Sequence, residues 1–249
     1  MGKPATTDTR EIIVEILLDL EKGQDFSHKL IKAVLDKYDY LDPRDKAFIK
    51  RVTEGTIERQ LELDYYLNRF SSVPVRKMKS LIRCLLRMST YQILYMDAVP
   101  DSAVCNEACK LAAKRGFRTL KGFVNAVLRN ISRSKDKMPL PDPADPVKYF
   151  SVKYSMPEWI VNLWLPVYGM EGTETLLMGL LKIHPVSLRF CLELSETDRE
   201  DLKKKIEATG VHLSAHKELP YVYLAENLEN VSELPGFAEG KFTVQDASS

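Results

Sequence analysis

The sequence predicts an all-helical domain followed by a small α+β domain. Apolar residues recur at helical spacing from residue 7 to residue 134, and no strand pattern interrupts them. Short runs of strand type begin only after Pro185. Residues 135–147 hold four prolines at short intervals, which neither a helix nor a central strand accepts. We therefore expect a helical domain over 1–134, a linker over 135–147 and an α+β domain over 148–249.

The first two helices are predicted from their apolar faces. The first face contains Ile12, Ile13, Ile16, Leu17 and Leu20. The second contains Phe26, Leu30, Ile31, Val34, Leu35 and Tyr38. Both patterns are too long for strands, so both segments are expected to form amphipathic helices.

A third helix is predicted to start after Asp42. Asp42 suits the N-cap, Pro43 suits the first helical position, and Asp45 favours the positive end of the helix dipole. The apolar pattern then continues as one helix to the Ser71–Pro74 break. Further helices are expected over residues 76–96, over 101–115 with Gly116 as the stop, and over 118–133.

The chain after the linker is expected to mix helices and strands. Helical patterns cover residues 149–154, 157–168 and 171–183, and Trp159 and Trp164 are expected in the core. Strands are expected over 187–194, 211–216, 221–225 and 242–245, with a helix over 198–209 that ends at Gly210. The β-α-β-β order indicates a small sheet with a helix on one face.

Charge is unevenly distributed along the chain, although the total is only +1. Residues 1–140 contain 26 Lys and Arg against 18 Asp and Glu, whereas residues 141–249 contain 10 against 17. The segment from Arg69 to Lys137 has 15 basic residues and four acidic ones. Such a concentration is typical of a surface that binds a phosphate backbone. A solvated helix surface is the alternative, but such surfaces usually mix both signs.

The basic residues of this segment recur at helical spacing. One stripe is predicted on the helix over 76–96, and it contains Arg76, Lys79, Arg83 and Arg87. A second stripe is predicted on the helix over 118–133, and it contains Arg118, Lys121, Asn125, Arg129 and Arg133. Lys114 and Arg115 precede it at a helix C-terminus, where the dipole favours cations. We expect both stripes to face solvent or phosphate.

The sequence lacks the common signatures of catalytic, cofactor and metal sites. No G-x-G-x-x-G loop follows a strand, and no phosphate loop is present. Cys105 and Cys109 are one helical turn apart, but the histidines are few and scattered, so we interpret both as buried small residues. His212 and His216 have the spacing of a zinc pair but are expected on a strand and a loop. No metal is therefore expected.

The four cysteines also lack the dense spacing of a disulfide framework, which favours a reducing cytoplasm. No apolar stretch approaches the ~18 residues that span a bilayer. We expect a cytoplasmic protein that does not bind membranes, and a monomer.

Several segments resemble bacterial proteins of one kind. The run "VPDSAVCNEACKLAAKRGFRTLKGFVNAVLRN" (Val99–Asn130) resembles a signature shared by NusB and the NusB-like domain of the Sun/RsmB family of ribosomal RNA cytosine-C5 methyltransferases. The strings "YSMPEWIVNLW", "HPVSLRF" and "LPGFAEGKFTVQDASS" are similar to the next domain of those methyltransferases, which NusB lacks. One departure is Cys191, where the family usually has Asn.

The resemblance implies a 16S rRNA methyltransferase that acts on cytosine C5. In that family S-adenosylmethionine and two catalytic cysteines belong to a Rossmann-like domain that follows the last string. One cysteine thiolate adds to C6 of the base, C5 takes the methyl group, and the second cysteine assists release. None of Cys84, Cys105, Cys109 and Cys191 matches those positions, so this chain alone is expected to hold no cofactor and to be inactive.

Together, the resemblance and the charge predict that the chain positions small-subunit rRNA through phosphate contacts. The expected contacts are Arg76, Lys79, Arg83, Arg87, Lys114, Arg115, Arg118, Lys121, Arg129 and Arg133, with Arg189 in the second domain. Gln245 and Asp246 are expected to adjoin the cofactor domain. Two alternatives remain open: a non-enzymatic NusB-like adaptor in transcription antitermination, against which the second domain argues, and a helical scaffold without an RNA role.

Overall fold

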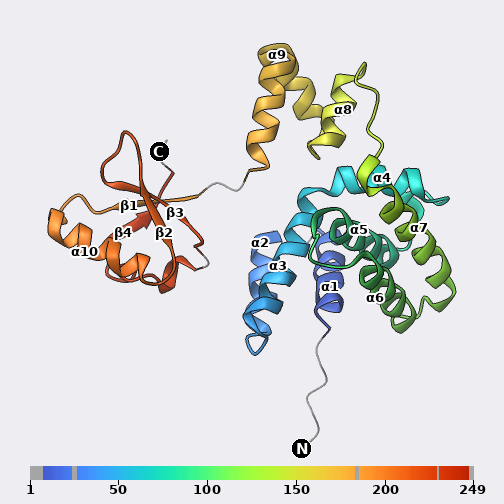
Figure 1. Cartoon of the computed structure of the whole chain (residues 1–249), viewed down its shortest axis with the longest axis horizontal. Helices are drawn as coiled ribbons and strands as arrows, with labels where there is room; N and C mark the ends of the chain where they lie inside the picture. The colour runs from blue at the N-terminus through green and yellow to red at the C-terminus, as the bar shows by residue number, and fades with distance from the viewer. Residues whose placement is uncertain (1–7, 24–26, 183–184, 229, 247–249) are drawn as a thin grey trace, which may run out of the picture. The chain divides into compact units, whose positions relative to one another are not determined.

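The computed structural model describes residues 8–23, 27–182, 185–228 and 230–246. They belong to two compact units, Met1–Leu181 and Lys182–Ser249. The first unit contains helices α1 to α9, and the second contains strands β1 to β4 with helix α10 (Figure 1). The predicted fold class, a helical part followed by a small α+β part, is confirmed.

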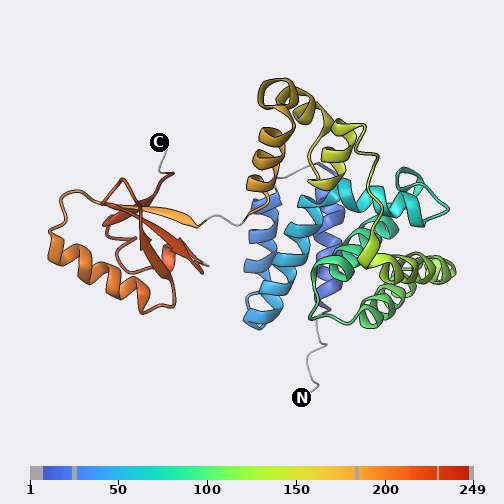
Figure 2. The ribbon, with the colours of Figure 1, turned by 45° about the horizontal axis from the view of Figure 1, so that its top comes forward.

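Three helices form one side of the first unit. They are α1 (Thr9–Glu21), α2 (Ser27–Lys37) and α3 (Pro43–Glu58). They contact one another and lie side by side in Figures 1 and 2. Asp8 caps α1 by accepting a hydrogen bond from the Arg10 N–H at 3.0 Å. Asp42 caps α3 by accepting from the Arg44 N–H at 2.8 Å, as predicted. Phe26, which was expected on α2, lies outside the described residues.

The predicted third helix is two helices. α3 ends at Glu58, and α4 (Gln60–Phe70) begins after Arg59, whose φ of −93° and ψ of 13° interrupt the helical geometry. The Arg59 guanidinium lies over the ring of Tyr95, 5.0 Å from its centroid, and 3.4 Å from the Glu62 carboxylate. No Pro or Gly marks the break, so the continuous apolar pattern gave no signal for it.

Helix α5 is the centre of the first unit. α5 (Ser80–Tyr95) contacts α1, α3, α4, α6 (Asp101–Lys114) and α7 (Lys121–Ser134). Most of its residues are buried, as expected of a helix with neighbours on every side. Gly116, with a φ of 88°, ends α6 as predicted.

The chain after the proline-rich segment continues the first unit. α8 (Pro146–Lys153) contacts α4, and Ser155 Oγ accepts a hydrogen bond from the Leu61 N–H at 3.1 Å. Met138, inside the expected linker, packs against the core of α1 to α7. The structure therefore places the division after Leu181 and not at the proline-rich segment, because α8 is packed on the preceding helices.

Helix α9 (Glu158–Leu180) is bent at Gly169, where φ is 66° and ψ is −174°. The bend separates the two helical patterns that the sequence predicts there. Trp164 packs against a small core that includes Phe150 and Val161. Trp159 is 69% exposed, so its expected core position was wrong. Both faces of α9 carry apolar residues, and periodicity alone does not identify the buried one.

The second unit is a four-stranded antiparallel sheet with one helix. The strands are β1 (Val186–Phe190), β2 (His212–Ala215), β3 (Val222–Glu226) and β4 (Phe242–Val244). Their order across the sheet is β2-β3-β1-β4. α10 (Glu196–Glu207) packs Leu202 and Ile206 into the core formed with Leu188, Phe190 and Phe242. Residues alternate between faces, so Arg189 lies on the face away from this core.

Candidate nucleic-acid interface

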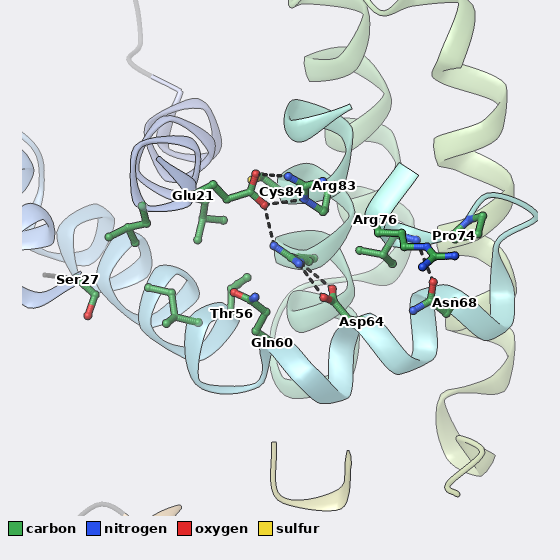
Figure 3. A pocket seen from close by; sticks show the side chains of 15 residues that line it. Glu21, Ser27, Thr56, Gln60, Asp64, Asn68, Pro74, Arg76, Arg83 and Cys84 are labelled. Atoms are coloured by element: carbon green, nitrogen blue, oxygen red, sulfur yellow. Dashed lines mark hydrogen bonds and ion pairs between the residues drawn. The ribbon is translucent and has the colours of Figure 1, made fainter. Parts of the chain in front are cut away.

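A groove of about 950 Å³ lies between α1, α4 and the start of α5. Figure 3 shows Arg83 of α5 pointing toward Glu21 of α1, with Asp64 of α4 in the same groove. Arg83 donates from Nε and Nη2 to the Glu21 carboxylate at 2.7 and 2.5 Å. Arg87 donates from Nη1 to Glu21 at 2.8 Å, and from Nε and Nη2 to Asp64 at 2.7 Å each. Within the groove, Arg83 and Arg87 are therefore neutralised by Glu21 and Asp64, whereas Arg76, which also lines it, forms no ion pair with a described acid.

This pairing corrects the predicted basic face of α5. Arg87 is only 8% exposed, and the side chain of Arg83 is 20% exposed. Burial acts to raise the pKa of Glu21, but the hydrogen bonds and charge of Arg83 outweigh it and lower that pKa. Arg87 is buried, so its predicted place on a solvent-facing stripe was wrong. A phosphate at either guanidinium group would have to displace carboxylates, and phosphate binding by Arg83 and Arg87 stays a prediction. Their partners lie far away in the sequence, where spacing gives no signal.

Arg76 and Lys79, the other two residues of the predicted stripe, lie before the start of α5. Arg76 and Lys77 lie in a 3₁₀ turn, η1 (Val75–Lys77), and Lys79 precedes the first turn of α5, so the helix expected from residue 76 starts later. Asn68 holds this turn by accepting a hydrogen bond from the Val75 N–H at 2.9 Å. All three cations are exposed. No carboxylate of the described residues forms an ion pair with them.

The basic end of α6 is also neutralised, in this case by α1. The Lys114 ammonium forms an ion pair with Glu11, and Arg115 Nη1 lies 2.9 Å from Glu15. The Lys114 hydrogen bond is the main cause that lowers the pKa of Glu11. Surface pairs of this kind contribute ~0–1 kcal/mol, so they tie α6 to α1 weakly. Lys114 and Arg115 are thus less available to phosphate than the sequence suggested.

Helix α7 retains the predicted basic stripe. Val124, Val127, Leu128 and Ile131 are buried on one face. The exposed cations are Arg118, in the preceding 3₁₀ turn η2 (Arg118–Leu120), and Lys121, Arg129 and Arg133 of α7. Within the described part of the chain no acid forms an ion pair with these four side chains. This row is the strongest candidate for phosphate contact, because no bound acid has to be displaced from it.

A hollow of about 360 Å³ adjoins this row, between α6 and α7. Its lining residues are Asn106, Cys109, Lys110, Lys121, Gly122, Asn125 and Arg129. Arg129 Nε donates to the Asn125 carboxamide oxygen at 3.1 Å, and the Asn125 amino group donates to no other described residue. Lys110 pairs with Glu107 at 2.8 Å, although the Lys110 side chain is 71% exposed. The hollow thus combines three cations with two carboxamides.

The second unit contributes one predicted cation. Arg189 is exposed on β1, and its Nη1 donates to the Gln245 carboxamide oxygen at 2.8 Å. The Gln245 N–H donates to the Ser187 carbonyl at 3.2 Å, which extends the pairing of β4 with β1. Asp246 follows directly. Gln245 and Asp246 thus lie directly after β4, and Arg189 contacts Gln245 from the neighbouring strand β1.

The cysteines and histidines show no arrangement for catalysis or metal binding in the described residues. Cys84, Cys105 and Cys109 are buried, and burial raises the pKa of each thiol, for Cys84 to about 12. His216 Nδ1 accepts hydrogen bonds from the N–H groups of the turn that follows it. No cluster of three His, Cys, Asp or Glu residues occurs among the positions that the structure describes. Over the same positions, no helix is both long and apolar enough to cross a bilayer.

The α7 row, the η1 cations and the groove at Glu21 all lie within one matched family region. The NusB family matches residues 7–133, more than half of the chain. The chain belongs to the NusB family. The resemblance of the Val99–Asn130 run to NusB is thereby confirmed.

Similarity to known proteins extends beyond that region. "Probable ribosomal RNA small subunit methyltransferase B" of Bacillus subtilis (strain 168) is 32% identical over 98% of this chain and 53% of its own length. The protein of the same name from Synechocystis sp. is 28% identical over 96% of this chain and 53% of its own length. The NusB-family chain therefore spans about half the length of these curated relatives.

A solved structure also resembles nearly the whole of this chain over about half of its own length. The crystal structure of PH0851 resembles this chain with a TM-score of 0.65 and 18% sequence identity, over 98% of this chain and 54% of PH0851. At that identity the likeness shows a shared fold alone. The fold of PH0851 thus includes counterparts of both the helical unit and the sheet unit.

Sequence reasoning missed two kinds of residue at the candidate interface. Asn106 and Lys110 are one turn apart on α6, but only the packing of α6 on α7 shows that they face the same hollow as Arg129. The acids that neutralise the other cations lie on α1 and α4, 23 to 104 residues away in sequence from their partners. Periodicity reports faces of one helix and carries no information on such pairs.

Proposed function

We propose that this chain is the RNA-binding part of an S-adenosylmethionine-dependent enzyme that methylates cytosine C5 in small-subunit rRNA. The observation that carries the RNA role is the row of exposed cations on α7 and η2, which no described acid neutralises. Phosphate contacts by such residues fix the position of an RNA without reading its sequence. The enzymatic context comes from the relatives, which are named ribosomal RNA small subunit methyltransferase B.

The chemistry is assigned to a part of the enzyme outside the described residues. The sheet of the second unit is antiparallel, whereas a nucleotide-type cofactor binds at the carboxyl ends of parallel strands. The buried thiols of α5 and α6 have raised pKa values, which disfavours the thiolate that attacks a base. The residues at hand therefore do not fit S-adenosylmethionine, and their role in the proposal is to bind and orient RNA in the cytoplasm.

A NusB-like adaptor is less well supported by the same observations. The similarity to the methyltransferases continues through the second unit, over 98% of the chain, and does not stop at residue 133. An adaptor of one domain has no evident use for that unit.

A filter-binding titration with fragments of small-subunit rRNA tests the RNA role. Four phosphate contacts predict that affinity falls about 50-fold or more between 50 and 200 mM salt. Affinity that does not change with salt, or no binding at low salt, would contradict the proposal. The same preparation, given labelled S-adenosylmethionine and rRNA, is expected to transfer no label; label in cytosine would show that the chain itself catalyses the reaction.

A further inference from the structure

The outer face of α9 before its bend is apolar and exposed. Trp159, Leu163 and Val167 recur every fourth residue and are 69%, 61% and 69% exposed. At helical spacing they share one face with the exposed Pro166, opposite the fully buried Val161. α9 packs mainly against α8 and lies at the margin of the first unit in Figures 1 and 2. Within the described part of that unit nothing covers this α9 stripe, which we define as Trp159, Leu163, Pro166 and Val167.

The α9 stripe is large enough to be a binding surface. Its four side chains expose about 400 Å² of apolar surface, a size at which contiguous patches often mark interaction sites. Each Å² that becomes buried contributes about 25 cal/mol, so covering the stripe is favourable. We therefore expect it to contact another apolar surface.

The chemistry of the α9 stripe indicates a protein partner. Between Glu158 and Tyr168 the sequence contains no Lys or Arg, and Glu158 is the only charged residue. RNA phosphates and anionic lipid headgroups are both bound through cations, so neither matches this face. An apolar protein surface does match it, because burial of such a surface needs no compensating charge.

The spacing of the stripe fits a second copy of the same chain. When two such segments pack antiparallel about a two-fold axis at Leu163, Leu163 meets its own counterpart, and Trp159 of each copy lies opposite Val167 of the other. Each large ring thus meets a small branched side chain, and the two leucines meet at the centre. No like charges face each other across this contact.

We propose that the α9 stripe forms an interface between two copies of this chain, related by a two-fold axis at Leu163. This departs from the monomer expected from the sequence, in which Trp159 was assigned to the core and no exposed apolar face was apparent. The inference does not depend on RNA binding, because the stripe contains no cation. Its failure would therefore leave the proposed function intact.

The proposed interface is small. With the residues that flank the stripe, two copies would bury on the order of 1,200 Å² in total, the lower end for specific interfaces. Contacts of this size fit a dimer that dissociates at micromolar concentration. At submicromolar concentration the chain is then a monomer, in which Trp159 is accessible to solvent.

Sedimentation velocity of the full 249-residue chain tests the interface. Between about 0.5 and 200 µM the weight-average mass should rise from that of one chain toward that of two. Leu163→Glu places two carboxylates face to face on the axis and should weaken association at least about 100-fold. Leu192→Glu, at a leucine of similar exposure (58%) outside the stripe, is the matched control and should associate as the wild type does. A chain that stays monomeric throughout, or association that the two substitutions change equally, overturns the inference.

Cysteine cross-linking tests the register of the two copies, in a chain whose partly exposed Cys191 is replaced (Cys191→Ser). Leu163→Cys brings the two thiols together on the axis, so mild oxidation should link the copies. In Val167→Cys the thiols lie about 12 Å apart along the helices, too far for a disulfide, and little product is expected. Equal cross-linking at the two positions contradicts the two-fold arrangement. Circular dichroism checks that each variant is folded.

Discussion

Arg87 of α5 binds Asp64 of α4 through two parallel hydrogen bonds of 2.7 Å, from Nε and Nη2 to the two carboxylate oxygens. Such a two-pronged pair fixes both the distance and the orientation of the groups. The third guanidinium nitrogen of Arg87, Nη1, donates to Glu21 of α1. One side chain therefore connects three helices at the margin of the main core, and its role is to hold the fold.

Arg87→Ala is expected to destabilise the chain by about 3 kcal/mol, because it leaves Asp64 and part of Glu21 without a cation in a poorly hydrated site. Urea unfolding measures this loss. Lys79→Ala, at an exposed cation beside the same helix, should change the free energy of unfolding by less than about 0.5 kcal/mol. If both variants were equally stable, the network would not contribute as described.

The salt dependence of RNA binding should distinguish paired from unpaired cations. Lys121→Gln combined with Arg129→Gln is expected to reduce the slope of log affinity against log salt by about 1.4, or about 0.7 per lost phosphate contact. The control is the double variant Lys114→Gln with Arg115→Gln. Because Glu11 and Glu15 already engage these two cations, their removal should leave the slope unchanged. An equal reduction of the slope in both double variants would mean that Lys114 and Arg115, at the end of α6, contact phosphate as well.

A buried carboxyl predicts a pH effect on stability. Burial raises the pKa of Glu62 above its ordinary 4.5, although Tyr95, Arg59 and Tyr66 favour its charged form. The folded chain therefore keeps this proton to higher pH than the unfolded chain, and the resulting stability is complete below pH 4.5 and lost as pH rises through the folded pKa. Relative to Glu62→Gln, the wild type should lose free energy of unfolding between pH 4.5 and neutral pH. A constant difference in urea unfolding experiments would show that Glu62 does not titrate in this way.

A close approach of α3 and α5 occurs at Gly55. The ring of Tyr91 occupies the position that a Cβ at residue 55 would take. Gly55→Ala should therefore destabilise the chain by about 2 kcal/mol through overpacking, against a gain of about 1 kcal/mol from helix propensity. A double-mutant cycle with Tyr91→Ala checks the cause: the penalty should vanish when the ring is absent. Additive effects would place the strain elsewhere.

The two tryptophans should differ in exposure. Trp159 is 69% exposed, and Trp164 packs against the core of α8 and α9. In a Trp164→Phe variant the remaining fluorescence is expected to be strongly quenched by iodide, and in Trp159→Phe it should be protected. Protection of Trp159 in the isolated chain would mean that α9 packs differently from the arrangement described.

Local signals in the sequence predicted local structure. Asp42 and Pro43 placed the start of α3, and Gly116 placed the end of α6, because caps and glycine stops act within a few residues. The break at Arg59 had no such signal, since it depends on contacts with Tyr95 and Glu62 that form only in the folded unit.

The sequence predicted the candidate site correctly only where the basic side chains form no ion pair in the folded chain. The α7 row follows from spacing, because its hydrophobic face is unambiguous and no described acid covers its cations. The burial of Arg87 depends on Glu21 and Asp64, which are brought together by three helices. The hollow depends on the packing of α6 against α7, which brings Asn106 and Arg129 together.

The contacts of Glu11 also bear on how the chain is synthesised. Its ion-pair partners Lys114 and Arg115 leave the ribosome about one hundred residues later, and α5, which packs on α1, precedes them only shortly. Since chains emerge from the amino end, α1 can pack against α2 and α3 early, but its contacts with α5 and α6 form only after much of the helical unit has been translated. Its apolar face, with Ile13 and Val14 fully buried in the finished protein, is covered only in part by α2 and α3 during that interval and is completed by segments that are translated later.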